Sequence, residues 1–157
     1  MICRVSHFEV QQLGEDFQLM TKHSGYNTNL AAEFHVLSVL HRLGLSASLT
    51  LANRKAIDIV VESHGNLYTI DVKGMASRTN WPMDNFKSPT VANHFIALVS
   101  FNNKIGDPAI APTVFLVPAE KISSFFYRNP KGNRQTVRYS TMRDKGQRYL
   151  DAWDQLQ

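Results

Sequence analysis

The chain has 157 residues, of which 43% are hydrophobic and 19% charged, proportions that exclude a disordered chain. No apolar run approaches the roughly 18–20 residues that a membrane-spanning helix needs, and the N-terminal residues lack the pattern of a secretion signal. The single cysteine excludes an internal disulfide and a cysteine-based zinc site. We therefore expect one globular domain over residues 1–157, cytoplasmic and without a membrane partner.

The net charge of +4 is modest, but its distribution is uneven. Between Arg128 and Arg148 the chain has seven basic residues, and Asp144 is the only acid. A basic C-terminal third is typical of proteins that bind a polyanion such as nucleic acid. Charge alone leaves a plain solvated face as an equal alternative.

Two helices are expected in the first part of the chain. A short one is placed around residues 9–22. A second is predicted over 29–43, because apolar residues recur there every three or four positions. Thr28 or Asn29 is the expected N-terminal cap and Gly44 the expected stop. The expected buried stripe consists of Leu30, Phe34, Leu37, Leu40 and His41.

The rest of the chain reads as strands and loops around a mixed sheet. Strands are predicted at 46–52, 56–63 and 67–73, with a hairpin turn at 64–66 between the last two. Residues 75–93 form a long polar loop in which a short helix is expected. Two apolar strands are predicted next, at 94–101 and 113–117. They are followed by a helix at 119–126, a late strand at 135–140 and a terminal helix at 141–156. This order predicts an α/β layered fold with a mixed central sheet.

Charged residues gather on one face of the predicted hairpin. If the turn is a two-residue Gly65-Asn66 loop, Asp58 lies opposite Lys73, and Asp71 points to the same face as Lys73. The opposite face is apolar and belongs to the core. Two carboxylates on neighbouring strands share a hard cation such as Mg²⁺ when their oxygens converge. Ordinary surface salt bridges between these carboxylates and Lys73 are the equal alternative.

Glu33 lies within the predicted apolar stripe of the helix at 29–43. A carboxylate in such a place is expected to be paired, protonated or bound to a metal. The alternative is a glutamate at the edge of the stripe near the helix N-terminus, where the helix dipole favours acidic side chains.

Together these residues resemble the PD-(D/E)xK nucleases, the restriction-endonuclease-like superfamily that includes Holliday-junction resolvases and bacterial relatives. The resemblance rests on Glu33 in "NLAAEFHVL", Asp58 in "KAIDIVV", and Asp71 and Lys73 in "YTIDVKG". The later segments "HFIALVSF" and "PTVFLVPAEKISSFF" extend it to about residue 126. The sequence departs from the pattern in having Asp at 71, where Glu is more frequent, and Ile57 in place of the proline that gives the motif its name.

The resemblance implies a fold and an activity. The fold is an αβββαβ core over about residues 29–118, with a C-terminal helical extension over about 119–157. The activity is metal-dependent hydrolysis of DNA by an endonuclease. Asp58, Asp71 and the Val72 carbonyl would hold Mg²⁺, for which Mn²⁺ would substitute. Lys73 would assist the attacking water, and Glu33 would be a further metal ligand or would accept a hydrogen bond next to the metal ligands.

Seven residues are predicted to contact nucleic acid: Arg54, Lys55, Arg78, Trp81, Lys87, Arg134 and Arg138. For Trp81, a lid packed on the core is an equal alternative, and for residues 53–55 a plain solvated turn is the alternative. The histidines show no paired metal spacing and are interpreted as ordinary surface or core residues.

Two other functions remain open at this stage. One is a nuclease-fold module that binds nucleic acid or a protein partner without cutting, and the other is a small-molecule or protein-binding α/β domain whose charges are structural. The sequence leaves open RNA as a substrate and a homodimer. The aromatic cluster at 125–127 suits either a dimer face or, as we expect, the core.

Overall fold

The computed structural model describes residues 24–50, 57–84, 86, 92–128, 130 and 134–157. The predicted helix at 9–22 lies outside these residues, as do the predicted nucleic-acid contacts Arg54, Lys55 and Lys87. No helix in the described part of the chain is long and apolar enough to cross a membrane.

The described residues form two sheets. The central sheet has five strands in the order β1-β2-β3-β5-β6, with β3 and β5 parallel and the other neighbours antiparallel. Its strands are β1 (Ser46–Leu49), β2 (Ile59–Ser63), β3 (Asn66–Met75), β5 (His94–Ser100) and β6 (Thr113–Pro118). The smaller sheet has the order β4-β8-β7, from β4 (Asn80–Pro82), β7 (Phe126–Arg128) and β8 (Gln135–Arg138).

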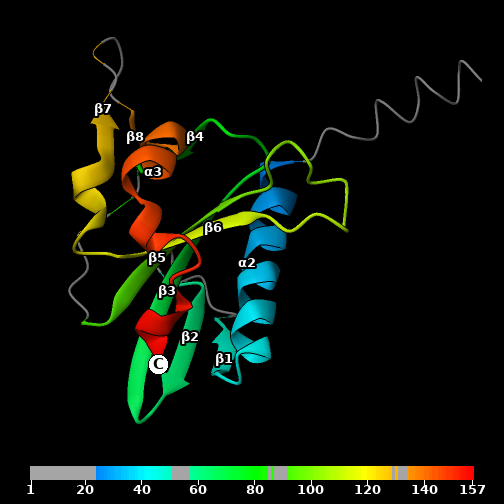
Figure 1. The fold of residues 1–157 in the computed structure, drawn as a ribbon, viewed down its shortest axis with the longest axis vertical. Helices are drawn as coiled ribbons and strands as arrows, with labels where there is room; N and C mark the ends of the chain where they lie inside the picture. Colours follow the sequence, from blue (N-terminus) through cyan, green and yellow to red (C-terminus); the bar gives the residue numbers. More distant parts are fainter. Residues whose placement is uncertain (1–23, 51–56, 85, 87–91, 129, 131–133) are drawn as a thin grey trace, which may run out of the picture.

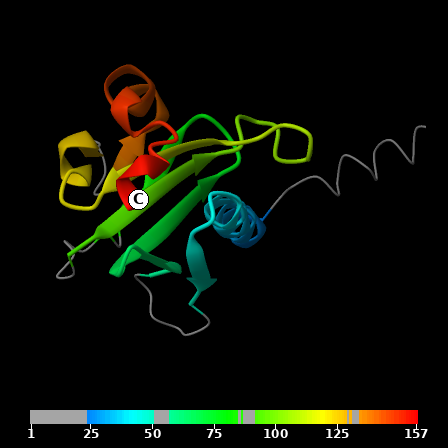
Figure 2. The same ribbon diagram turned by 60° about the horizontal axis from the view of Figure 1, so that its bottom comes forward.

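The central sheet separates two hydrophobic clusters. Helix α2 (Gly25–Arg42) covers one face, and the smaller sheet and helix α3 (Tyr139–Lys145) lie on the other (Figure 1, Figure 2). The face toward α2 is lined by alternate strand residues such as Ile59, Ile70 and Val99, all fully buried. The predicted α/β fold is therefore confirmed, with a helix, then a mixed central sheet, then a C-terminal helix.

Helix α2 begins earlier and is rotated relative to the prediction. Its N-terminal cap is Ser24, whose hydroxyl accepts the Asn27 N–H at 3.1 Å. The residues it buries are Thr28, Ala32, Val36 and Leu40, whereas Phe34, predicted to be buried, is 53% exposed. The physical reason is close contact with β3.

Gly74 is the point of closest approach between β3 and α2. A Cβ at this position would lie 2.7 Å from the Thr28 carbonyl oxygen and 2.9 Å from the Ala32 Cβ. The Gly74 N–H also donates to the Asn29 side-chain oxygen at 3.1 Å. Small helix residues therefore face the sheet here, and the larger Phe34 points away.

The β2–β3 hairpin has the predicted faces but a different register. Ser63 pairs with Asn66, so the two-residue turn is His64-Gly65, with positive φ values of 49° and 77°. The predicted Gly65-Asn66 turn is wrong, and pairing is shifted by two residues. Because side chains alternate with a period of two, an even shift keeps every side chain on its predicted face.

The C-terminal part departs most from the prediction. The expected helix at 141–156 is α3 followed by two 3₁₀ helices, η2 (Gln147–Tyr149) and η3 (Trp153–Leu156). Helix α3 is followed by Gly146. Further along, the Asp151 N–H donates to the Val114 carbonyl at the edge of β6. Pairing with this sheet edge replaces helix continuation after the glycine.

The helix expected from 119–126 is a 3₁₀ helix, η1 (Ile122–Phe125), that leads into β7. Phe126 and Tyr127 have high strand propensity and pair with β8 opposite Val137 and Thr136. Phe125 and Phe126 pack against the second hydrophobic cluster, so the core interpretation of these two aromatic residues is confirmed. The predicted late strand at 135–140 is β8.

Candidate active site

Asp58 directly precedes β2 and bonds to β3 through both its backbone N–H and its side chain. Regular pairing of β2 with β3 ends at Ile59 and Ile70. One residue further on, the Asp58 carboxylate accepts the Val72 N–H at 2.6 Å. The carboxylate therefore occupies the place that another strand residue would fill in a continued ladder, and it is held beside Asp71.

Asp71 and Lys73 lie on β3 and point to the same face, as predicted. The Lys73 Nζ lies 2.6 Å from the Asp71 Oδ1, and the pair is mostly shielded from solvent. The observed pairing ends with Ile59 opposite Ile70, and continued by one residue it would put Asp71 across from Asp58, where the predicted register put Lys73. The two carboxylates are therefore closer together in the observed register than in the predicted one.

Glu33 lies one residue from the buried line of α2 and is half-buried, which agrees with a place at the edge of the stripe. Because α2 begins at Gly25, Glu33 lies outside its first turn, so the expected proximity to the helix N-terminus is wrong. Partial burial raises the pKa of its carboxyl group. The charge of Asp58 raises this pKa further, and the charge of Lys73 opposes the rise. Glu33 is thus within electrostatic reach of the hairpin charges.

Burial raises the pKa of Asp71 to about 6, and the nearby Asp58 adds to the rise, against the opposing charge and hydrogen bond of Lys73. A folded-state pKa above the unfolded one means that the folded protein binds the proton more tightly. The stability that this proton contributes is present below about pH 4 and is lost as pH rises through about 6.

We predict that Asp71→Asn removes the loss of stability that ionisation of Asp71 causes as pH rises. Without divalent ions, the free energy of unfolding of the variant relative to wild type should increase by on the order of 2–3 kcal/mol between pH 4 and pH 7. Denaturant unfolding at several pH values measures this difference, and the contributions of titrating groups that do not interact with Asp71 cancel in it. A difference that does not change with pH would contradict the raised pKa.

The donor set suits a hard divalent cation. Asp58 and Asp71 each use one oxygen in the bonds described and keep the other for a further partner. The N–H and C=O of a strand residue point to the same side, so the Val72 carbonyl also faces Asp58. Two carboxylates and one carbonyl, with water, are oxygen ligands of the kind that Mg²⁺ prefers. Among the described residues no group of three acidic, histidine or cysteine side chains is placed to hold a metal, so Glu33 does not complete such a set.

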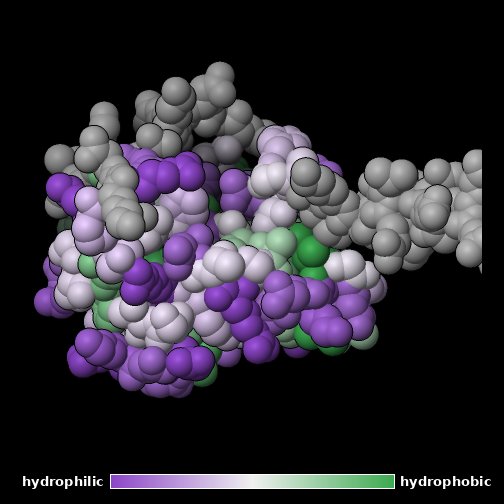
Figure 3. All heavy atoms as spheres, turned by 90° about the horizontal axis from the view of Figure 1, so that it is seen from above, coloured by the Kyte–Doolittle hydropathy of each residue, from purple (hydrophilic) through white to green (hydrophobic). Residues whose placement is uncertain are grey.

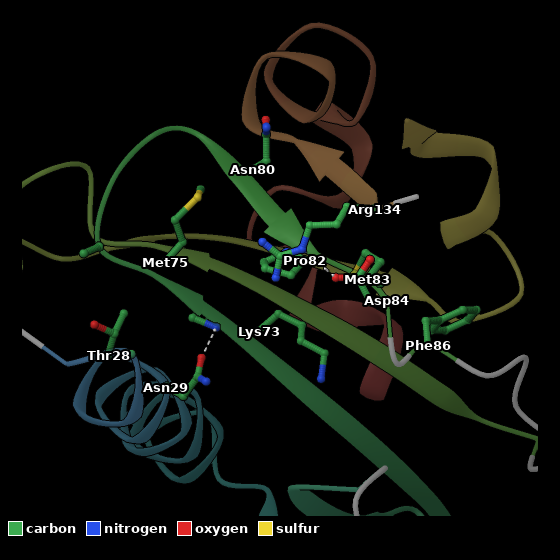
Figure 4. A pocket seen from close by; sticks show the side chains of 13 residues that line it. Thr28, Asn29, Lys73, Met75, Asn80, Pro82, Met83, Asp84, Phe86 and Arg134 are labelled. Atoms are coloured by element: carbon green, nitrogen blue, oxygen red, sulfur yellow. Dashed lines mark hydrogen bonds and ion pairs between the residues drawn. The ribbon is translucent and has the colours of Figure 1, made fainter. Parts of the chain in front are cut away.

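A cleft of about 550 Å³ opens beside Lys73. Figure 4 shows Thr28 and Asn29 of α2 on one side of it and Asn80, Pro82 and Asp84 on the other. Of the four predicted catalytic residues, Lys73 lines the cleft. Lys73, whose ammonium group is bonded to Asp71, therefore links the two carboxylates to this cleft.

The predicted nucleic-acid contacts fall into two groups. Trp81 is fully buried, and its Nε1 donates to the Val99 carbonyl at 3.0 Å. It is therefore packed in the core, as the alternative interpretation held, and is not available to stack on a base in this structure. Arg78 and Arg134 are exposed, and Arg138 is half-buried. Arg134 lines the cleft and forms an ion pair with Asp84 at 3.2 Å.

Sequence reasoning missed one neighbour of the carboxylates. His94 pairs in register with Thr69, and its Nδ1 lies 2.7 Å from the Thr69 hydroxyl. Burial lowers the pKa of His94. The charge of Asp58 opposes this lowering, and the charge of Lys73 adds to it. Because β5 is parallel to β3 and follows a long loop, no spacing in the sequence indicates this neighbourhood.

No protein-family model and no curated protein matches the sequence. Among solved structures, the chain is similar to the bacterial homing endonuclease I-Ssp6803I, with a TM-score of 0.53 and 17% sequence identity. The match covers 83% of this chain and 89% of the endonuclease chain. At this identity the similarity shows a shared fold, so the chain has a nuclease-like α/β fold.

Proposed function

We propose that this protein is a divalent-metal-dependent endonuclease that hydrolyses phosphodiester bonds of DNA, of the PD-(D/E)xK type. The observation that supports this most is the juxtaposition of Asp58 and Asp71 at the end of the hairpin, with Lys73 bonded to Asp71 and lining the cleft. The structural neighbour is named a homing endonuclease, which supports DNA as the substrate.

In this proposal the residues of the chain divide the chemistry between them. Asp58 and Asp71, with the Val72 carbonyl, would hold the ion, and Glu33 would act on them through its charge. The bound ion would stabilise negative charge on the scissile phosphate. The Lys73 ammonium group, at the edge of the cleft, would orient the attacking water and stabilise charge on the phosphoryl oxygens.

The activity is tested with single-stranded, duplex, nicked and branched DNA in Mg²⁺ or Mn²⁺. We expect wild type to cut at least one of these substrates and Lys73→Ala to lose about a hundredfold or more in rate, as when one charge-stabilising donor is removed. Lys121→Ala is the matched control, because Lys121 is exposed and paired with Glu120 outside the cleft. Equal cutting by wild type and Lys73→Ala would contradict the role of Lys73.

One observation favours a second candidate, a nuclease-fold module that binds DNA without cutting it. Asp58, Asp71 and Lys73 already satisfy one another and the backbone through the bonds described. Such a module would bind DNA and leave all four substrates intact in both metals. A metal-dependent cut that is lost in Lys73→Ala would reject it.

A further inference from the structure

A second hollow, of about 560 Å³, lies next to the cleft beside Lys73. It is lined by three arginines, Arg78, Arg138 and Arg143, and by the hydroxyl-bearing residues Thr79, Tyr139 and Ser140. No acidic side chain lines it among the described residues. Asn80 lines both hollows, so the two spaces adjoin.

Arg78 is held in place without losing its charge. Its Nε donates to the Asn102 side-chain oxygen at 3.0 Å, and the same oxygen accepts the Tyr139 hydroxyl at 3.3 Å. The Asn102 amide nitrogen in turn donates to the Thr113 hydroxyl at 2.9 Å. A neutral amide therefore fixes the orientation of the guanidinium group and leaves its terminal N–H donors for another partner.

Arg138 is held in a similar way by an aromatic ring. Its guanidinium carbon lies 3.2 Å from the centre of the Tyr127 ring. Within the described residues neither Arg78 nor Arg138 makes an ion pair, whereas Arg143 is paired with Asp144 at 2.7 Å. Arg78 and Arg138, neither of them in an ion pair among the described residues, thus line the same hollow, an arrangement that suits a phosphate.

The surface around this end of the molecule is polar. Viewed from the end where α3 and β4 lie, the described surface is mostly hydrophilic, and hydrophobic residues reach it only in small separate areas (Figure 3). A partner at such a surface is held by charge and hydrogen bonds, and the arginines of the hollow give that charge a positive sign, which suits a nucleic-acid backbone.

We propose that the hollow of Arg78, Arg138 and Arg143 binds a backbone phosphate of DNA next to the scissile one, with Asn102 as a positioning residue for Arg78. The proposal rests on the proposed function in taking DNA as the substrate. Because Asn80 lines both the hollow and the cleft, a strand anchored at the hollow would continue along the cleft that Lys73 also lines. The hollow would set the position of the strand and have no part in the chemical step.

DNA binding is measured by fluorescence anisotropy without divalent ions, so that no cutting occurs, over a range of salt concentrations. For Arg78→Gln and Arg138→Gln we expect affinity to fall roughly three- to tenfold at low salt and the salt slope to fall by about 1 in each variant. Arg148→Gln is the matched control, because Arg148 is also exposed and near an aromatic ring but outside the hollow. We expect it to bind as wild type does.

Asn102→Asp provides an isosteric test of whether Arg78, held next to Asn102, acts through its charge. Aspartate tolerates the positive φ of 57° at this position, so the fold is retained. Its carboxylate would neutralise Arg78 in place and lower both affinity and salt slope, as Arg78→Gln does. Binding by Asn102→Asp equal to that of wild type would contradict the contact of Arg78 with DNA.

The results separate this proposal from the proposed function. Loss of binding in the two arginine variants, in a protein that never cuts DNA, would support the hollow and reject the nuclease. Unchanged binding in both variants of a protein that cuts DNA would reject the hollow alone. A hollow that binds inorganic phosphate while the variants keep full DNA affinity, or a wild type that binds no DNA, would also overturn it.

Discussion

Replacement of Asp71 by asparagine is expected to lower the rate of DNA cleavage by about a thousandfold or more. The change keeps the shape of the side chain and removes the charge that would hold the ion, and losing about 4 kcal/mol of metal-supplied stabilisation corresponds to this factor. The expected loss does not come from unfolding. Near pH 7 the same change should stabilise the fold, because Asp71 is ionised there at the cost of burial.

Glu62→Gln is the matched control for Asp71→Asn. Glu62 lies on the same face of the hairpin but is exposed and pairs with Leu67 near the turn. The same chemical change at this position should leave both the cleavage rate and the stability close to those of wild type. A thousandfold loss in both variants would show that the overall charge of the hairpin, and not a site at Asp71, determines the rate.

Replacement of Trp81 by alanine is expected to lower the free energy of unfolding by about 3–5 kcal/mol, as for other buried aromatic side chains. Trp81 is fully buried and makes an edge contact with Phe115, with ring centres 6.3 Å apart. It also packs on Tyr139, with ring centres 5.9 Å apart. It therefore joins the smaller sheet to the central one.

Denaturant unfolding at fixed pH measures this loss, with Trp81→Phe as the comparison. Phenylalanine keeps an aromatic ring in the core but loses the hydrogen bond from Nε1 to the Val99 carbonyl, and it leaves part of the indole volume empty. We expect Trp81→Phe to lose clearly less stability than Trp81→Ala. A loss below about 1 kcal/mol for Trp81→Ala would show that the side chain is not in the core.

The sequence was sufficient to predict the order of the central elements and the two faces of the hairpin. Strand alternation determines which side chains share a face, and an even error in register does not change it. For this reason the alternation places Asp58, Asp71 and Lys73 on one face even when the turn is put one residue too late. The turn itself depends on positive φ values at His64 and Gly65, for which Gly65 and Asn66 offered an equally plausible pair.

The remaining differences come from contacts between distant segments. The buried side of α2 follows from its close approach to Gly74, which no periodicity within residues 29–43 indicates. Trp81 is buried because β4 pairs with β8, more than fifty residues further along the chain. The hollow lined by Arg78, Arg138 and Arg143 depends on the same pairing, so sequence reasoning identified two of its arginines without placing them together.

Calorimetric titration of Mn²⁺ into the wild type and into Asp71→Asn at pH 7.5 tests the central claim most directly, because it needs no knowledge of the preferred DNA. If Asp58 and Asp71 form a metal site, the wild type should bind a divalent ion that Asp71→Asn does not bind, and Glu62→Gln should bind it as wild type does. Equal uptake by wild type and Asp71→Asn, or no uptake by wild type at millimolar Mn²⁺, would contradict a metal site at this pair.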